Sequence, residues 1–93
     1  MNAPETVRRR VVVHGHVQGV FFRDTARRKA AGLGVTGSVR NCPDGTVEAV
    51  FEGDPDSVAT LVDWCRHGPR GADVSRVDVH EEEPEGLNRF EVR

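Results

Sequence analysis

The order in which strand and helix patterns follow one another constrains the fold of this 93-residue chain more than any other feature. Three consecutive β-branched residues, Val11-Val12-Val13, are typical of a strand with at least one buried face. Asp54 as an N-cap, Pro55 at the first helical position and Gly68-Pro69 as a stop mark a helix most clearly. From the N- to the C-terminus, the patterns predict a strand, a helix, two strands, a helix, a strand and a short last strand: about residues 7–14, 21–31, 35–41, 46–52, 54–68, 73–82 and 90–92.

This βαββαβ order restricts the topology. Two right-handed crossovers produce an antiparallel sheet with both helices on one face, which is the α+β, ferredoxin-like split βαβ sandwich. We expect residues 1–93 to form a single domain, with residues 1–6 as a flexible N-terminal extension. The fold serves many activities, so it does not select one.

Composition excludes several functional classes. The chain has 13 basic and 15 acidic residues, which leaves no broad basic surface for nucleic acid. Aromatic residues make up only 5%, and no predicted central strand carries the aromatic cluster of an RNA-binding sheet. No apolar run approaches the roughly 20 residues that span a bilayer, and the N-terminus lacks signal-peptide features. We therefore expect a cytoplasmic monomer without nucleic-acid or membrane partners, in which Cys42 and Cys65 stay unpaired.

A glycine-bracketed segment joins the first predicted strand to the first predicted helix: Gly15-His16-Val17-Gln18-Gly19-Val20-Phe21-Phe22-Arg23. Such a loop can turn several main-chain N–H groups toward one point, and the positive end of the helix dipole adds to their field. Arg23, in the first helical turn, can offer a bidentate fork to two phosphoryl oxygens. The segment thus indicates a phosphate site. The alternative is a tight turn beside a solvated arginine, because loose glycine patterns recur by chance.

A second segment of interest runs from Gly37 to Glu48 and contains Asn41 at the end of a predicted strand. In the predicted topology the central strands are neighbours, so Asn41 can approach the loop that follows the first strand. A side-chain amide both donates and accepts hydrogen bonds, so it can hold a water molecule without titrating. The alternative for Asn41 is stabilisation of its own turn, the role that we assign to Asp44.

Both segments resemble the two signatures of the acylphosphatase family, in the same order, and the resemblance extends over about residues 7–93. It implies a hydrolase of the carboxyl–phosphate bond that acts on small acyl phosphates without a metal or other cofactor. By position, Arg23 matches the family's essential arginine and Asn41 its water-orienting asparagine. The loop His16-Val17-Gln18-Gly19-Val20 is similar to its phosphate cradle. Position 38, often aromatic in such proteins, is Ser38 here.

Three other readings of the sequence stay open at this point. His14 and His16 suggest a metal pair, but no third or fourth ligand is recognisable nearby. Cys42 beside Asn41 suggests a nucleophile, but no partnered base is apparent. A regulatory domain that binds phosphate or carbamoyl phosphate without turnover would use a similar loop.

Overall fold

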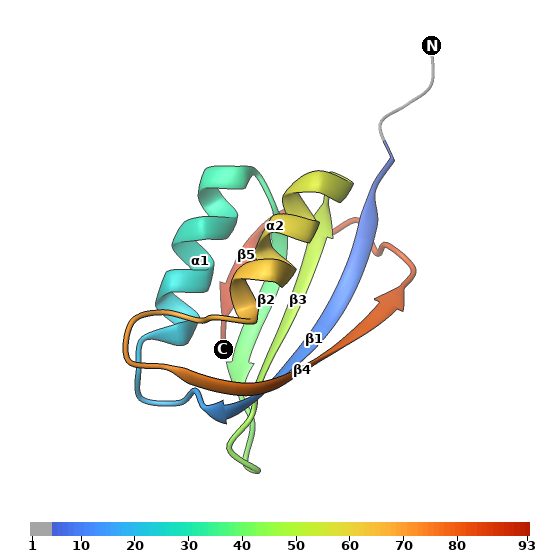
Figure 1. Cartoon of the computed structure of the whole chain (residues 1–93). Helices are drawn as coiled ribbons and strands as arrows, with labels where there is room; N and C mark the ends of the chain where they lie inside the picture. Colours follow the sequence, from blue (N-terminus) through green and yellow to red (C-terminus); the bar gives the residue numbers. More distant parts are fainter. Residues whose placement is uncertain (1–4) are drawn as a thin grey trace.

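The computed structural model describes residues 5–93, so the predicted flexibility of residues 1–6 falls mostly on residues that lie outside the described part. The predicted order of elements is confirmed (Figure 1). The elements are β1 (Val7–His16), α1 (Phe22–Leu33), β2 (Thr36–Asn41), β3 (Val47–Gly53), α2 (Pro55–Cys65), β4 (Asp73–Glu82) and β5 (Phe90–Val92). Asp54 caps α2 as predicted, because its carboxylate accepts a hydrogen bond from the Ser57 N–H at 3.1 Å.

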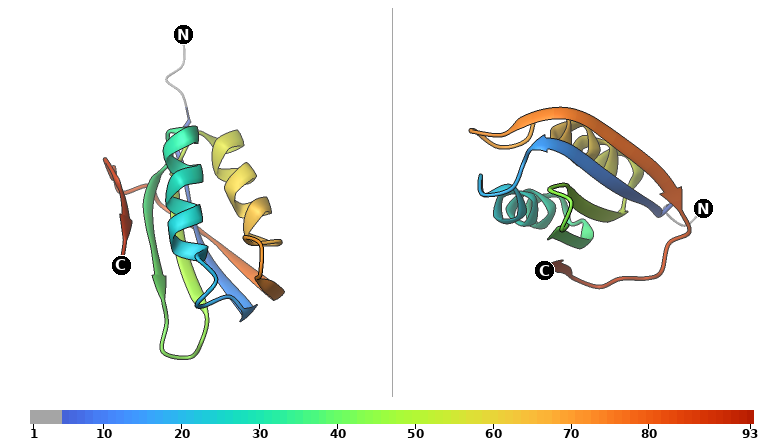
Figure 2. Two further views of the ribbon diagram at one scale, coloured as in Figure 1. Left: turned by 90° about the vertical axis from the view of Figure 1, so that its left-hand side faces the viewer. Right: turned by 90° about the horizontal axis from the view of Figure 1, so that it is seen from below.

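The strands form one sheet in the order β4-β1-β3-β2-β5, and both helices cover the same face of it (Figure 2). The first four strands pair antiparallel, as predicted. β5 differs, because it pairs parallel to β2 and makes the sheet mixed. The reason lies in the connection after β4. It leads from one edge of the sheet to the other, and the chain returns antiparallel to β4, which is the direction of β2.

The core lies between the two helices and the sheet. Phe22, Ala26 and Ala30 form the buried face of α1, and the ring of Phe22 contacts Trp64 of α2 with centroids 4.9 Å apart. Leu33, which continues the same helical spacing, is 38% exposed. The helix ends there because Gly34 adopts the left-handed conformation.

Gly15 belongs to β1 and not to the loop that it was expected to bracket. The pairing of β1 with β4 shifts between His14 and Gly15, which leaves Ser75 as the extra residue of a bulge. A side chain at position 15 would collide with the main-chain oxygen of Asp73. Glycine at position 15 therefore allows the close approach of β1 and β4 at this bulge.

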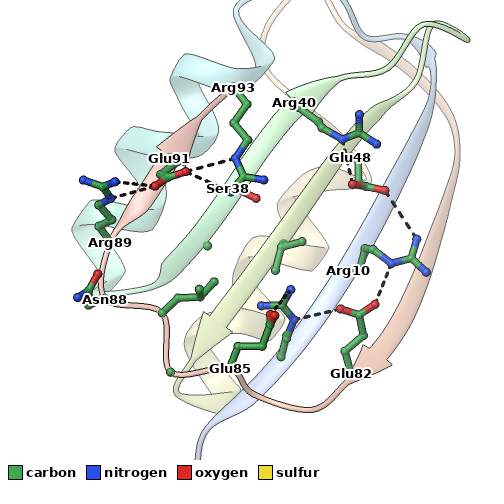
Figure 3. Close-up of a pocket in the computed structure, with 15 residues that line it drawn as sticks. Arg10, Ser38, Arg40, Glu48, Glu82, Glu85, Asn88, Arg89, Glu91 and Arg93 are labelled. Atoms are coloured by element: carbon green, nitrogen blue, oxygen red, sulfur yellow. Dashed lines mark hydrogen bonds and ion pairs between the residues drawn. The ribbon is translucent and has the colours of Figure 1, made fainter.

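The sheet face opposite the helices carries cross-strand ion pairs (Figure 3). The Arg10 Nε donates to Glu82 at 2.9 Å and its Nη1 lies 3.8 Å from Glu48, while the Arg40 Nε donates to the other oxygen of Glu48 at 3.1 Å. These four residues link β4, β1, β3 and β2. Ser38 lines the hollow of about 900 Å³ over this face and does not line the site described below.

Glu52 fixes the connection that leads to β5. Its carboxylate is 3% exposed and accepts hydrogen bonds from the N–H groups of Glu85, Gly86 and Leu87 at 3.0, 2.7 and 3.1 Å. Arg8 adds a fourth donor at 3.3 Å. A buried charge with four donors is satisfied, and it ties the segment before β5 to the middle of the sheet.

We expect Glu52→Gln to lower the free energy of unfolding by about 2 kcal/mol at neutral pH, because charged hydrogen bonds are replaced by neutral ones. Burial acts to raise the pKa of Glu52, but the hydrogen bonds from the three N–H groups and Arg8 outweigh it and hold the pKa below its usual value. This stabilisation is present above the unfolded-state pKa of about 4.3 and is lost as the pH falls through the folded-state pKa. Urea unfolding between pH 6 and pH 3 should therefore show that the free energy of unfolding falls more steeply with decreasing pH in the original protein than in the variant.

Glu83→Gln is the control, because it removes an exposed carboxylate of the same connection. Equal acid slopes for the original protein and Glu52→Gln would contradict the expectation.

Candidate active site

A cavity of about 350 Å³ lies where the start of α1 meets the ends of β2 and β5. In Figure 1 the start of α1 and the ends of these two strands point to the same end of the molecule. The two residues predicted for catalysis, Arg23 and Asn41, both line it. The other lining residues are Val17, Gly19, Phe21, Phe22, Asp24 and Val92. The predicted approach of Asn41 to the segment after β1 is therefore observed.

Arg23 lies in the first turn of α1, half-buried at the cavity. Its Nη1 donates to the main-chain oxygen of Arg93 at 2.9 Å. This bond holds one side of the guanidinium against the end of β5. An arginine carries five N–H donors, so the remaining ones stay available for two oxygens of a bound anion. Sequence reasoning did not foresee the contact with Arg93.

The main chain between β1 and α1 is shaped to present N–H groups. Gly19 and Phe21 both have positive φ, 74° and 61°, and α1 begins after Phe21 without a side-chain cap. Within residues 5–93, the N–H groups of residues 18–21 donate to no main-chain oxygen outside the regular ladders. An uncapped helix start with free N–H groups is a site for an anion.

Gln18 connects this loop to the β2–β3 turn. Its Nε2 donates to the main-chain oxygens of Cys42 and Thr46 at 2.7 and 2.9 Å. Of the five predicted loop residues, Val17 and Gly19 line the cavity, whereas His16, Gln18 and Val20 do not. His16 is exposed at the end of β1 and Val20 packs against the core. The side chain of Gln18 thus acts on the shape of the loop, because it fixes the loop to the segment that follows Asn41.

Asn41 is the last residue of β2 and is half-buried. The adjoining turn is held by Asp44, whose Oδ1 accepts hydrogen bonds from the Thr46 N–H at 3.0 Å and its hydroxyl at 2.6 Å. These bonds also hold the pKa of Asp44 below its usual value, the Thr46 hydroxyl having the largest effect. The turn role assigned to Asp44 is confirmed. The turn thus has its stabilising side chain without Asn41, which lines the cavity together with Arg23.

Four lining residues were missed by sequence reasoning: Phe21, Phe22, Asp24 and Val92. Asp24 brings a negative charge to the site, but it pairs with Arg27 at 2.9 Å and Arg28 at 3.4 Å. The hydrogen bond from Arg27 is the main reason why the pKa of Asp24 is lowered. Val92 enters the site because β5 runs parallel to β2, and no local signal in the sequence announces that pairing.

The alternative sites gain little from the geometry. In the described part of the chain, no group of three or more His, Cys, Asp or Glu residues is placed to hold a metal ion. The His14 Nε2 lies 2.9 Å from the Asp78 carboxylate, within hydrogen-bond distance. Cys42 and Cys65 are free thiols, and burial raises the pKa of Cys65 to about 12.

Comparisons with known proteins identify the family. The sequence profile of the family named Acylphosphatase matches residues 9–92. The chain belongs to the acylphosphatase family. An acylphosphatase of Rubrobacter xylanophilus is 57% identical over 93 residues, which cover 99% of this chain and 84% of that protein. As a member of this family, the chain is a hydrolase.

Solved acylphosphatase structures agree with the fold. The structure of an acylphosphatase from Coxiella burnetii has a TM-score of 0.90 and 43% identity, covering 95% of this chain and 93% of its own. The acylphosphatase from Bacillus subtilis has a TM-score of 0.89 and 32% identity, covering 94% and 98%. Among residues 5–93, no helix is both long and apolar enough to cross a membrane.

Proposed function

We propose that this chain hydrolyses small acyl phosphates to a carboxylate and inorganic phosphate, with Arg23 and the main chain of the 16–20 loop holding the phosphoryl group and Asn41 orienting the attacking water. The observation that carries the proposal is the single cavity that Arg23 and Asn41 share at an uncapped helix start. Its polar groups are a guanidinium, an amide and main-chain N–H groups, and its one carboxylate, Asp24, is paired with arginines. Such a donor set suits an anion and not a cation.

The reaction needs few groups. The water oxygen attacks phosphorus while the bond from phosphorus to the carboxylate oxygen breaks in line with it. The electron pair of that bond leaves with the carboxylate, and the proton of the water passes to the phosphate product or to solvent. The leaving carboxylic acid has a pKa of about 4, so its anion departs at neutral pH without a general acid.

Binding and positioning then supply most of the rate enhancement. Phosphoryl transfer passes through a loose transition state with charge on the equatorial oxygens, which fixed donors stabilise. Arg23 and the loop N–H groups stabilise that charge, while Asn41 holds the water in line with the breaking bond. Two contacts fix these groups relative to one another. The Arg23 guanidinium donates to the Arg93 oxygen, and the Gln18 amide donates to the β2–β3 turn.

We extend the proposal to the location, oligomeric state, partners and cofactors of the enzyme. We propose a cytoplasmic monomer with a small-molecule substrate, without nucleic-acid or membrane partners and without a metal or other cofactor. The net charge of −2 supports the absence of a nucleic-acid partner.

Release of inorganic phosphate from acetyl phosphate in the presence of excess EDTA tests the function. We expect turnover at the same rate with and without the chelator, because none of the proposed roles requires a metal ion. A rate that falls on chelation and returns with a divalent cation would overturn the metal-free mechanism. Binding of phosphate without turnover would favour the regulatory domain over the enzyme.

A further inference from the structure

Phe21 is unusual in both conformation and exposure. Its φ is 61°, and every other residue with positive φ in the described range 5–93 is a glycine. Its side chain is 80% exposed, while the other exposed large hydrophobic residues of this range lie between 38% and 43%. A bulky residue in the left-handed region is a conformational outlier that costs free energy.

The backbone explains the left-handed conformation but not the phenyl ring. The turn at Phe21 starts α1, and its main-chain oxygen accepts hydrogen bonds from the Thr25 N–H at 3.1 Å and the Thr25 hydroxyl at 2.8 Å. A glycine would adopt this conformation without strain, as Gly19 does two residues earlier at φ 74°. Core packing does not explain the ring either, because it is Phe22 that enters the core, at 2% exposure.

The location of Phe21 supplies a reason for the ring. Phe21 lines the cavity of Arg23 and Asn41, and so does Val92 of β5, which is 43% exposed. The cavity thus combines a polar part, with Arg23 and Asn41, and apolar side chains at its exposed surface. An acyl phosphate has the same two-part character, a charged phosphoryl group joined to a carbon-based acyl group.

We infer that Phe21, together with Val92, binds the acyl group of the substrate, and that the enzyme favours acyl phosphates with an aromatic or extended apolar acyl group over acetyl phosphate. This inference rests on the proposed function. With the phosphoryl group held at Arg23, the acyl group extends past the remaining lining of the cavity toward solvent. An exposed phenyl ring there gains contact only when a substrate covers it, which explains why a side chain is kept at a strained position.

Steady-state kinetics of Phe21→Gly with benzoyl phosphate and acetyl phosphate test this inference. The quantity to measure is the ratio of kcat/KM for the two substrates, compared between proteins, because their intrinsic reactivities then cancel. We expect the ratio to fall about fivefold in Phe21→Gly, through a higher KM for benzoyl phosphate with little change in its kcat. Phe21→Leu should show a smaller fall. Phe21→Gly should fold, since glycine relieves the strain at this position.

Leu33→Ala is the matched control, because Leu33 is an exposed hydrophobic residue at the other end of α1. Its ratio should equal that of the original protein. An unchanged ratio in Phe21→Gly, or an equal loss for both substrates, would overturn the inference.

A binding measurement separates this inference from the proposed function. Calorimetry with benzoylphosphonate and acetylphosphonate, in which a P–C bond replaces the scissile P–O bond, should show about fivefold tighter binding of the benzoyl compound, lost in Phe21→Gly. If the original protein turned over neither acyl phosphate, the proposed function would fail while this preference could still be measured. Equal affinities for the two phosphonates in the original protein would sink the inference, whatever the turnover.

Discussion

Replacing Arg23 with alanine is expected to lower kcat/KM for acetyl phosphate by about a thousandfold or more and to abolish inhibition by inorganic phosphate. One preorganised donor at a transition-state oxygen contributes about a hundredfold to a thousandfold, and Arg23 offers a fork of two. Arg23→Lys should recover little of the activity, because an ammonium group supplies a point charge without the planar fork. Phosphate release from acetyl phosphate, with phosphate as a product inhibitor, measures both effects.

Arg66→Ala is the matched control for this experiment, because Arg66 is an exposed arginine at the end of α2 and does not line the cavity. It should hydrolyse acetyl phosphate at the original rate. Circular dichroism should show that Arg23→Ala is folded, since the one side-chain hydrogen bond that Arg23 makes within residues 5–93, to the Arg93 oxygen, is exposed to solvent. A folded Arg23→Ala protein with normal turnover would refute the assignment of the active site.

For Asn41→Ala we expect a different pattern, in which kcat falls about a hundredfold while the inhibition constant of inorganic phosphate changes less than about twofold. The amide is proposed to hold the water and not the phosphoryl group, so its loss should spare binding. Asn41→Asp keeps an acceptor for the water but adds a negative charge, and it should weaken phosphate binding as well. Product inhibition together with kcat distinguishes these outcomes.

The matched control for Asn41 is Asn88→Ala, because Asn88 is an exposed asparagine on the connection before β5, away from the cavity. Its kcat and phosphate inhibition should both be unchanged. A collapse of phosphate affinity in Asn41→Ala would make Asn41 a phosphate-binding residue and would leave the orientation of the water to another group.

Local signals account for the parts of the fold that could be predicted. The Asp54 cap with Pro55 defined the start of α2, and Asp44 was correctly assigned to the turn that joins β2 to β3. Local signals placed Arg23 at a helix start and Asn41 at a strand end, but the role expected of Asn41 came chiefly from the family resemblance. Topology then brought the two residues to one cavity.

Long-range contacts account for what could not be predicted. β5 has three residues, and its parallel pairing depends on partners far away in the sequence. Phe90 stacks on Phe51 with centroids 6.1 Å apart, and Glu52 holds the preceding connection. The contribution of Val92 to the cavity and the bond from Arg23 to the Arg93 oxygen both follow from that docking. No local pattern of residues 83–93 contains this information.

The charged face of the sheet has a consequence for how copies of this molecule can meet. A two-layer fold leaves one side of its sheet in water, and a bare apolar surface there would invite a second sheet to stack on it. Here the alternation of Glu82, Arg10, Glu48 and Arg40 across four strands means that stacking would strip water from several ions at once, at a cost of several kcal/mol for each ion. The ion pairs contribute little to the stability of a single molecule. Their larger effect is to disfavour aggregation through the one face that the helices leave uncovered.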